Sequence, residues 1–157
     1  MSVKPRGRQS IQSSALEETA FIAILRAADG LERKAAAMLK RYGLTSTQYN
    51  ALRILRGGGP CGLACSEIGN RMMSHDPDIT RLLDRLKRRG LISRRRGQKD
   101  RRIIKAFITP SGLTLLEAMD RPVERFHRQL LGRVNKERLI HLIQVLDEFQ
   151  EYVCSRG

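Results

Sequence analysis

The chain has 157 residues, of which 41% are hydrophobic and 29% charged, and this balance is typical of one soluble globular domain. No apolar run approaches the roughly 20 residues needed to span a bilayer, and the N-terminal stretch lacks the apolar segment of a secretory signal. These features argue against an integral membrane protein or an exported one, so we expect a cytoplasmic protein.

The formal net charge of +14 is concentrated in two stretches of the chain. Residues 81–105 carry twelve basic side chains and two acidic ones, whereas residues 1–9 add three basic groups and no acid. A positive field focused in this way suits a polyanion. Nucleic acid is therefore the first candidate partner, and an anionic membrane surface is the second.

The N-terminal third predicts two helices after a disordered basic tail over residues 1–13. Residues 14–42 carry apolar side chains three or four positions apart, which is the spacing of one helix face. A second helix follows Thr45, since Thr45 with Gln48 three positions later forms a capping box. The Gly-rich stretch 57–63 is a loop by composition.

The middle of the chain predicts a winged helix-turn-helix. A short helix from Ser66 to about Met73 is followed by a helix over 77–89, which has one apolar stripe and one charged face. Two strands, 91–96 and 102–109, then flank a turn at 97–101. A basic hairpin directly after a helix-turn-helix is a wing. The fold class is therefore mainly α with a small β-hairpin wing.

The C-terminal third predicts two more helices. Thr109 caps the first, with Pro110 in its first turn and Pro122 as an expected kink, and Asn135 caps the second. We treat 14–154 as a single domain, in which residues 44–109 form the winged helix-turn-helix. Because the apolar stripes of 14–42 and 110–154 exceed the needs of one small domain, we interpret these helices as dimerisation helices. The alternative is that they pack only within the monomer.

Several segments together resemble the MarR family of bacterial transcription regulators: "LTSTQYNALRIL" (44–55), "SEIGNRM" (66–72), "DITRLLDRLKRRGLISR" (78–94), "DRRIIKAFIT" (100–109) and "SGLTLLEAM" (111–119). The resemblance covers residues 14–153. It implies a homodimer whose helix over 77–89 enters the major groove and whose wing-tip arginine reaches the minor groove. It also implies that a small aromatic acid or an oxidant alters DNA affinity. Two features depart from the family pattern: Gly69, where Ala is usual, and the Gly- and Cys-containing loop 57–65.

Base reading requires short or donor-bearing side chains at the start of the helix over 77–89. Arg81 is suited to a bidentate contact with guanine, while Arg85 and Arg88 are better suited to phosphates. In the wing, Asp100 would be repelled by phosphate, so we expect it to orient a neighbouring arginine. The complete set of expected DNA-binding residues is Ser74, His75, Asp78, Thr80, Arg81, Arg85, Arg88, Arg94, Lys99, Arg101 and Arg102.

Other chemistry is less well supported by the sequence. Arg26, Tyr42 and Tyr49 are candidates for a ligand crevice, but nothing in the sequence selects a ligand. Cys61 and Cys65 are candidates for oxidant sensing, although cysteine is also simply a small buried residue. No nucleophile–base pair, metal-ligand spacing or cofactor motif is present, so we expect neither an enzyme nor a metal site.

The sequence thus predicts a homodimeric, sequence-specific DNA-binding regulator. We expect a repressor that binds an inverted repeat and is relieved by a small aromatic ligand. Two alternatives remain open, namely a redox sensor acting through Cys61 and Cys65, and a non-specific architectural DNA binder.

Overall fold

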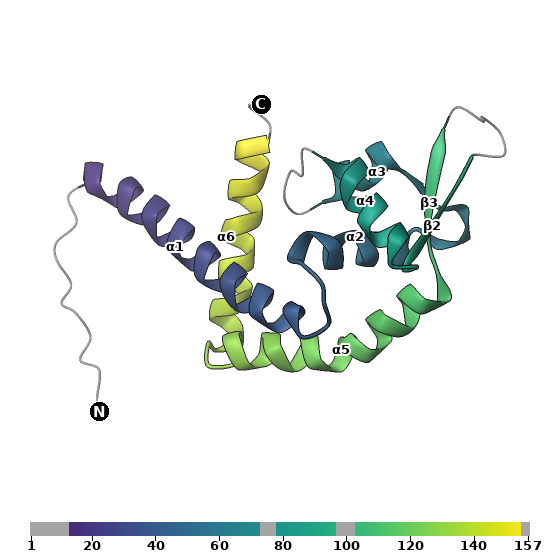
Figure 1. Ribbon diagram of the computed structural model, residues 1–157. Helices are drawn as coiled ribbons and strands as arrows, with labels where there is room; N and C mark the ends of the chain where they lie inside the picture. Colours follow the sequence, from purple (N-terminus) through teal and green to yellow (C-terminus); the bar gives the residue numbers. More distant parts are fainter. Residues whose placement is uncertain (1–12, 73–77, 97–102, 155–157) are drawn as a thin grey trace. The chain divides into compact units, whose positions relative to one another are not determined.

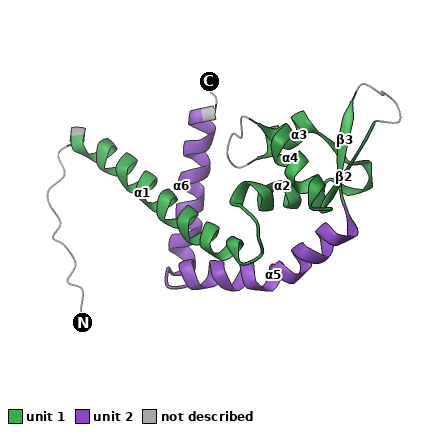
Figure 2. Cartoon of the chain, viewed as in Figure 1, with its two compact units in different colours: residues 1–108 green, residues 109–157 purple. Residues whose placement is uncertain are grey.

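The computed structural model describes residues 13–72, 78–96 and 103–154 (Figure 1). The chain divides into two compact units, residues 1–108 and 109–157 (Figure 2). The boundary falls after residue 108, one residue before the predicted end of the winged helix-turn-helix, and the prediction of a single domain over 14–154 stays a prediction. Each unit is therefore described separately, and the predicted tail over residues 1–13 lies almost entirely outside the described residues.

The first unit contains five α-helical or 3-10 segments and three strands within its described residues. In chain order they are α1 (Ser13–Lys40), α2 (Ser46–Gly57), a 3-10 turn (Gly59–Cys61), β1 (Leu63–Ala64), α3 (Cys65–Arg71), α4 (Ile79–Arg88), β2 (Ile92–Arg96) and β3 (Ile104–Ile108). The second unit consists of α5 (Pro110–Leu131) and α6 (Lys136–Cys154). The predicted fold class, mainly helical with a small β-wing, is confirmed.

Local side-chain chemistry sets several helix starts at the predicted positions. The Thr45 hydroxyl accepts a hydrogen bond from the Gln48 N–H at 3.2 Å, and the Gln48 side chain accepts one from the Thr45 N–H. This reciprocal pair is the predicted capping box. Thr109 likewise accepts from the Gly112 N–H at the start of α5, and Asn135 accepts from the Arg138 N–H at the start of α6.

Of the predicted boundaries that differ from the structure, two lie next to residues 73–77. Helix α4 begins at Ile79, two residues later than expected, because Asp78 is its N-cap and accepts from the Arg81 N–H. Helix α3 ends at Arg71 and is followed by Met72 in extended backbone conformation. Both differences shorten the helices next to residues 73–77, which are not described. Pro122 lies inside α5, which continues to Leu131.

The wing is one part of a three-stranded antiparallel sheet with the order β1-β3-β2. Strand β3 is central: Ala106 pairs with Arg94 of β2 on one side and with Leu63 of β1 on the other. The prediction of a loop throughout residues 57–63 was therefore wrong at Leu63. A two-residue strand has no alternating pattern to reveal it, and only its partner β3 makes it a strand.

The core of the first unit holds the helix-turn-helix together. Helix α2 contacts α3 and α4, and the side chains of Leu52, Ile68, Leu83 and Leu86 are almost fully buried. Burial of an aliphatic side chain contributes about 1.5–3 kcal/mol, so this cluster fixes α3 and α4 relative to each other. In the second unit, Leu116 and Met119 of α5 are fully buried.

Candidate nucleic-acid interface

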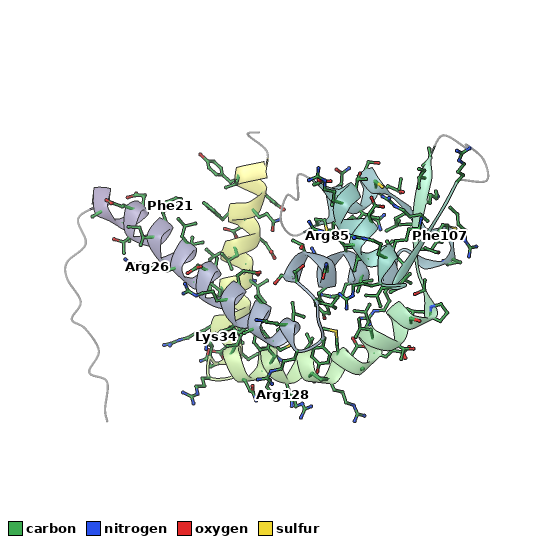
Figure 3. All side chains as sticks on the ribbon, viewed as in Figure 1. Phe21, Arg26, Lys34, Arg85, Phe107 and Arg128 are labelled. Atoms are coloured by element: carbon green, nitrogen blue, oxygen red, sulfur yellow. The ribbon has the colours of Figure 1, made fainter. Side chains whose placement is uncertain are left out.

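Helix α4 presents a cationic surface because its two faces differ. Leu82, Leu83 and Leu86 are buried, which leaves the polar positions of the helix on its other side. Five of these polar side chains line a shallow concave surface, namely Arg81, Asp84, Arg85, Lys87 and Arg88. Four of the five are cationic, and Arg85 is labelled on α4 in Figure 3. Such a surface suits the phosphates of a nucleic acid backbone.

The N-terminus of α4 holds Arg81 in a defined orientation. One Asp78 carboxylate oxygen accepts the Arg81 backbone N–H at 3.0 Å, and the other lies 2.9 Å from Arg81 Nε. The Arg81 side chain is nevertheless 79% exposed. It is thus oriented by the protein while its guanidinium remains accessible. Thr80, the neighbouring candidate, is exposed as well.

The three arginines at the end of β2 differ in their surroundings. Arg95 and Arg96 are exposed, and the Arg95 guanidinium lies 5.7 Å from the centre of the Phe107 ring, which is labelled in Figure 3. The Arg94 side chain is only 15% exposed and donates a 2.6 Å hydrogen bond to Asp84. In the sequence the three arginines form one basic run, whereas in the structure Arg94 is largely buried and Arg95 and Arg96 are exposed.

Six of the predicted DNA-binding and wing-orienting residues lie outside the described residues, namely Ser74, His75, Lys99, Asp100, Arg101 and Arg102. Their roles remain predictions. The described part of the candidate surface is therefore α4 with the base of the wing. Of the predicted residues, Arg81, Arg85 and Arg88 line one concave surface, Asp78 contacts Arg81, and Thr80 is exposed beside them in the sequence.

Two further contacts of basic residues were not anticipated from the sequence. Arg89 donates from Nη1 to the Gly43 carbonyl at 2.6 Å, which ties the end of α4 to the turn after α1. Lys105 donates from Nζ to the Cys61 carbonyl at 3.3 Å. Both are long-range contacts to backbone carbonyls, so no sequence motif announces them.

The ligand and redox candidates have the following surroundings. Arg26 is exposed on α1, whereas Tyr42 and Tyr49 are half-buried, and the Arg53 guanidinium lies 5.8 Å from the centre of the Tyr49 ring. Cys61 is exposed and Cys65 is half-buried, and both are free thiols. Their ligand and redox roles remain predictions.

Two helices carry large apolar side chains that stay exposed in the chain. On α1 these are Leu16, Phe21, Ile22, Ile24, Leu25 and Leu31, and Figure 3 labels Phe21. On α6 they are Ile140, Leu142, Ile143, Val145, Leu146, Phe149, Tyr152 and Val153. Exposed apolar patches of this extent are uncommon on monomeric soluble proteins. Among the described helices, none has the length and apolar character to cross a membrane.

The sheet order, the buried helix pair and the cationic outer face of α4 define a winged helix-turn-helix DNA-binding protein. The MarR family model matches residues 44–104. A solved MarR transcription factor from Planctomyces limnophilus is 35% identical, covers 84% of this chain and 96% of its own, and has a TM-score of 0.67. The chain belongs to the MarR family; it is a DNA-binding transcription regulator and not an enzyme.

Two further relatives are informative. The homoprotocatechuate degradative operon repressor of Escherichia coli is 25% identical over 134 residues, which are 85% of this chain and 89% of the repressor. The S. aureus MepR–DNA complex has the same fold, with a TM-score of 0.76 at 22% identity over 83% of this chain and 96% of that one.

Proposed function

We propose that this regulator is a homodimeric repressor that binds an inverted-repeat operator. The observation that carries the proposal is the cationic, outward-facing surface of α4, with Arg81 oriented by Asp78 at its N-terminus. A guanidinium at this position suits guanine O6 and N7 in the major groove. The name of the Escherichia coli relative as a repressor supports repression over activation.

The dimer is supported by the exposed apolar faces of α1 and α6. Eight large apolar side chains of α6 are at least 40% exposed in the chain. Covering them with a second copy would stabilise the dimer by about 25 cal/mol for each Å² of apolar area removed from water. A two-fold dimer would present two α4 helices to successive major grooves, about 10 bp apart. This geometry is what favours an inverted repeat.

In vitro selection of bound duplexes by the full chain tests the DNA proposal. We expect enrichment of an inverted repeat and a steep loss of affinity with added salt, because each cation–phosphate contact releases counterions. The selected duplex should outcompete unrelated DNA by about 10³-fold or more at 0.15 M salt. Binding without preference for any duplex would contradict the proposal and favour the non-specific architectural alternative.

The dimer is tested by a matched pair of variants on α6. Ile143 is 56% exposed, and Ile143→Asp would place a charge in the proposed interface. The control is Gln144→Asp, which introduces the same charge at the neighbouring exposed polar position. We expect sedimentation equilibrium to show weakened association for Ile143→Asp only. An unchanged dimer in both variants, or a monomeric wild type, would contradict the proposed interface.

Relief by a small aromatic acid is a further part of the proposal. Arg26, Tyr42 and Tyr49 are the candidate residues, because a cation and aromatic rings each suit an aromatic carboxylate. Thermal denaturation with a panel of phenolic acids tests it, since a ligand that binds the folded state raises the melting temperature. For the redox alternative, peroxide should release DNA from the wild type and not from Cys61→Ser or Cys65→Ser.

A further inference from the structure

Arg94 differs from Arg95 and Arg96 of the same strand because its side chain is largely buried. Side chains alternate across a strand, so Arg94 shares the face of Ile92, which is 2% exposed, and it pairs with Ala106, which is 1% exposed. Arg95 lies on the opposite face, against Phe107. A guanidinium on the inner face of the sheet is desolvated and requires partners within the protein.

The partners of Arg94 come from two other elements of the DNA-binding unit. Nη1 donates to Asp84 Oδ1 of α4 at 2.6 Å, and Nη2 donates to Cys65 Sγ at the start of α3 at 3.4 Å. The third donor, Nε, is buried and has no hydrogen-bond partner among the described residues. The guanidinium therefore joins β2, α3 and α4, and the Arg94 side chain is only 15% exposed.

Asp84 is in an unexpected place for a carboxylate. It lies on the concave surface of α4 among Arg81, Arg85, Lys87 and Arg88, and its side chain is half exposed. A negative charge here opposes the attraction of that surface for phosphate. On electrostatic grounds alone, neutral Asn would serve DNA binding better than Asp. The hydrogen bond from Arg94 Nη1 indicates that the Asp84 carboxylate has a structural role instead.

We propose that Asp84 and Arg94 are positioning residues that fix α4 relative to the wing, and that Arg94 does not contact DNA. The inference rests on the proposed DNA-binding function. Helix and wing would approach separate parts of the duplex, so their relative position decides whether both fit at once. Because the pair is already formed in the free protein, less conformational entropy is lost when α4 and the wing bind DNA. Removing one partner leaves the other uncompensated in a partly buried site.

Asp84→Asn separates a positioning role from direct DNA contact by Arg94, because the two roles predict opposite changes in the affinity for the selected duplex. If Arg94 contacted phosphate, the variant would release its guanidinium and remove a repulsive charge, so affinity for the selected duplex would rise. For a positioning pair, we expect that affinity to fall about tenfold. Affinity for unrelated DNA should stay constant or rise. Loss of folded protein would lower both affinities in parallel, so their ratio distinguishes positioning from a general structural defect.

Arg94→Met and Arg95→Met form a matched pair on the same strand. A phosphate contact contributes about 1 to the slope of log affinity against log salt concentration. We expect Arg94→Met to weaken specific binding with an unchanged slope. In a double-mutant cycle, Asp84→Asn with Arg94→Met should cost little more than either change alone, because both remove one pair. Arg95→Met is the control, because it removes an exposed arginine from the same strand.

The outcomes separate the inference from the function on which it rests. Tighter specific binding by Asp84→Asn, a slope reduced by about 1 in Arg94→Met, or additive effects in the cycle would overturn the positioning role alone. A wild type that selects no duplex would contradict the proposed function and the positioning role together.

Discussion

The carboxylate of Asp78 contacts Arg81 twice, once at the backbone N–H and once at Nε of the side chain. One residue therefore starts α4 and orients the exposed Arg81 guanidinium in its first turn. Asp78 was expected from the sequence to face DNA. Its two contacts with Arg81 favour an indirect role instead, in which Asp78 orients the Arg81 side chain.

We predict that Arg81→Ala and Arg88→Ala weaken binding in different ways. Loss of a bidentate arginine–guanine contact costs about 1–3 kcal/mol and relaxes base preference at one position. Loss of a phosphate contact weakens all sequences alike. Affinity measurements on the selected duplex and its single-base variants test this. Equal base preferences in the two variants would show that Arg81 does not read a base.

We predict that Asp78→Asn keeps the fold and reduces discrimination. Asn is as good an N-cap as Asp, so the free energy of unfolding should change by less than about 1 kcal/mol. The ion pair with Arg81 Nε is lost, so specificity at the base that Arg81 reads should fall. Asp78→Ala is the comparison, because it removes the cap as well and costs about 0.5–2 kcal/mol of stability. Unchanged specificity in Asp78→Asn would exclude the orienting role.

We predict that Gly69→Ala stabilises the protein. Gly69 lies in α3, and among the described residues a Cβ there would meet only Ile79 Cγ1, at an ordinary 3.6 Å. Replacing Gly by Ala inside a helix contributes about 0.5–1 kcal/mol, so the melting temperature should rise. The departure from the usual family residue therefore has no steric cause in the described structure.

The matched control for Gly69 is Gly62→Ala. Gly62 has a φ of +62°, and a Cβ there would lie 2.5 Å from Phe107 Cε1. Both the backbone conformation and the contact oppose a side chain, so we expect a loss of about 1–3 kcal/mol. If both variants shifted the melting temperature in the same direction, the steric argument would be wrong.

We predict that Thr45→Ala destabilises α2, whereas Thr45→Ser does not. The Thr45 hydroxyl is the acceptor of the capping box with Gln48. Its removal should cost about 0.5–2 kcal/mol in the free energy of unfolding, and Ser retains the acceptor. Urea denaturation of the three proteins measures the difference. Equal midpoints for Ala and Ser would indicate that the cap contributes nothing.

Local signals were sufficient to predict the helices and two of the strands. The caps at Thr45, Thr109 and Asn135 depend only on residues three positions away, and apolar spacing identified the buried face of α4. Contacts between distant residues were not accessible in this way. Strand alternation places Arg94 on the same face as Ile92, but no pattern in the sequence identifies Asp84 or Cys65 as its partners.

The pairing of β1 with β3 also has a consequence for how the molecule opens. Leu63 precedes α3 and Ala106 follows α4 and β2, so their pairing closes a chain loop that encloses the whole helix-turn-helix. The ladder at the two ends of this loop, together with the packing of α3 and α4 on each other and on α2, couples the opening of these elements. We therefore expect amide hydrogens of α3, α4 and β3 to exchange with solvent at similar rates, as one cooperative unit. Local fraying confined to α4 would give it faster exchange than β3.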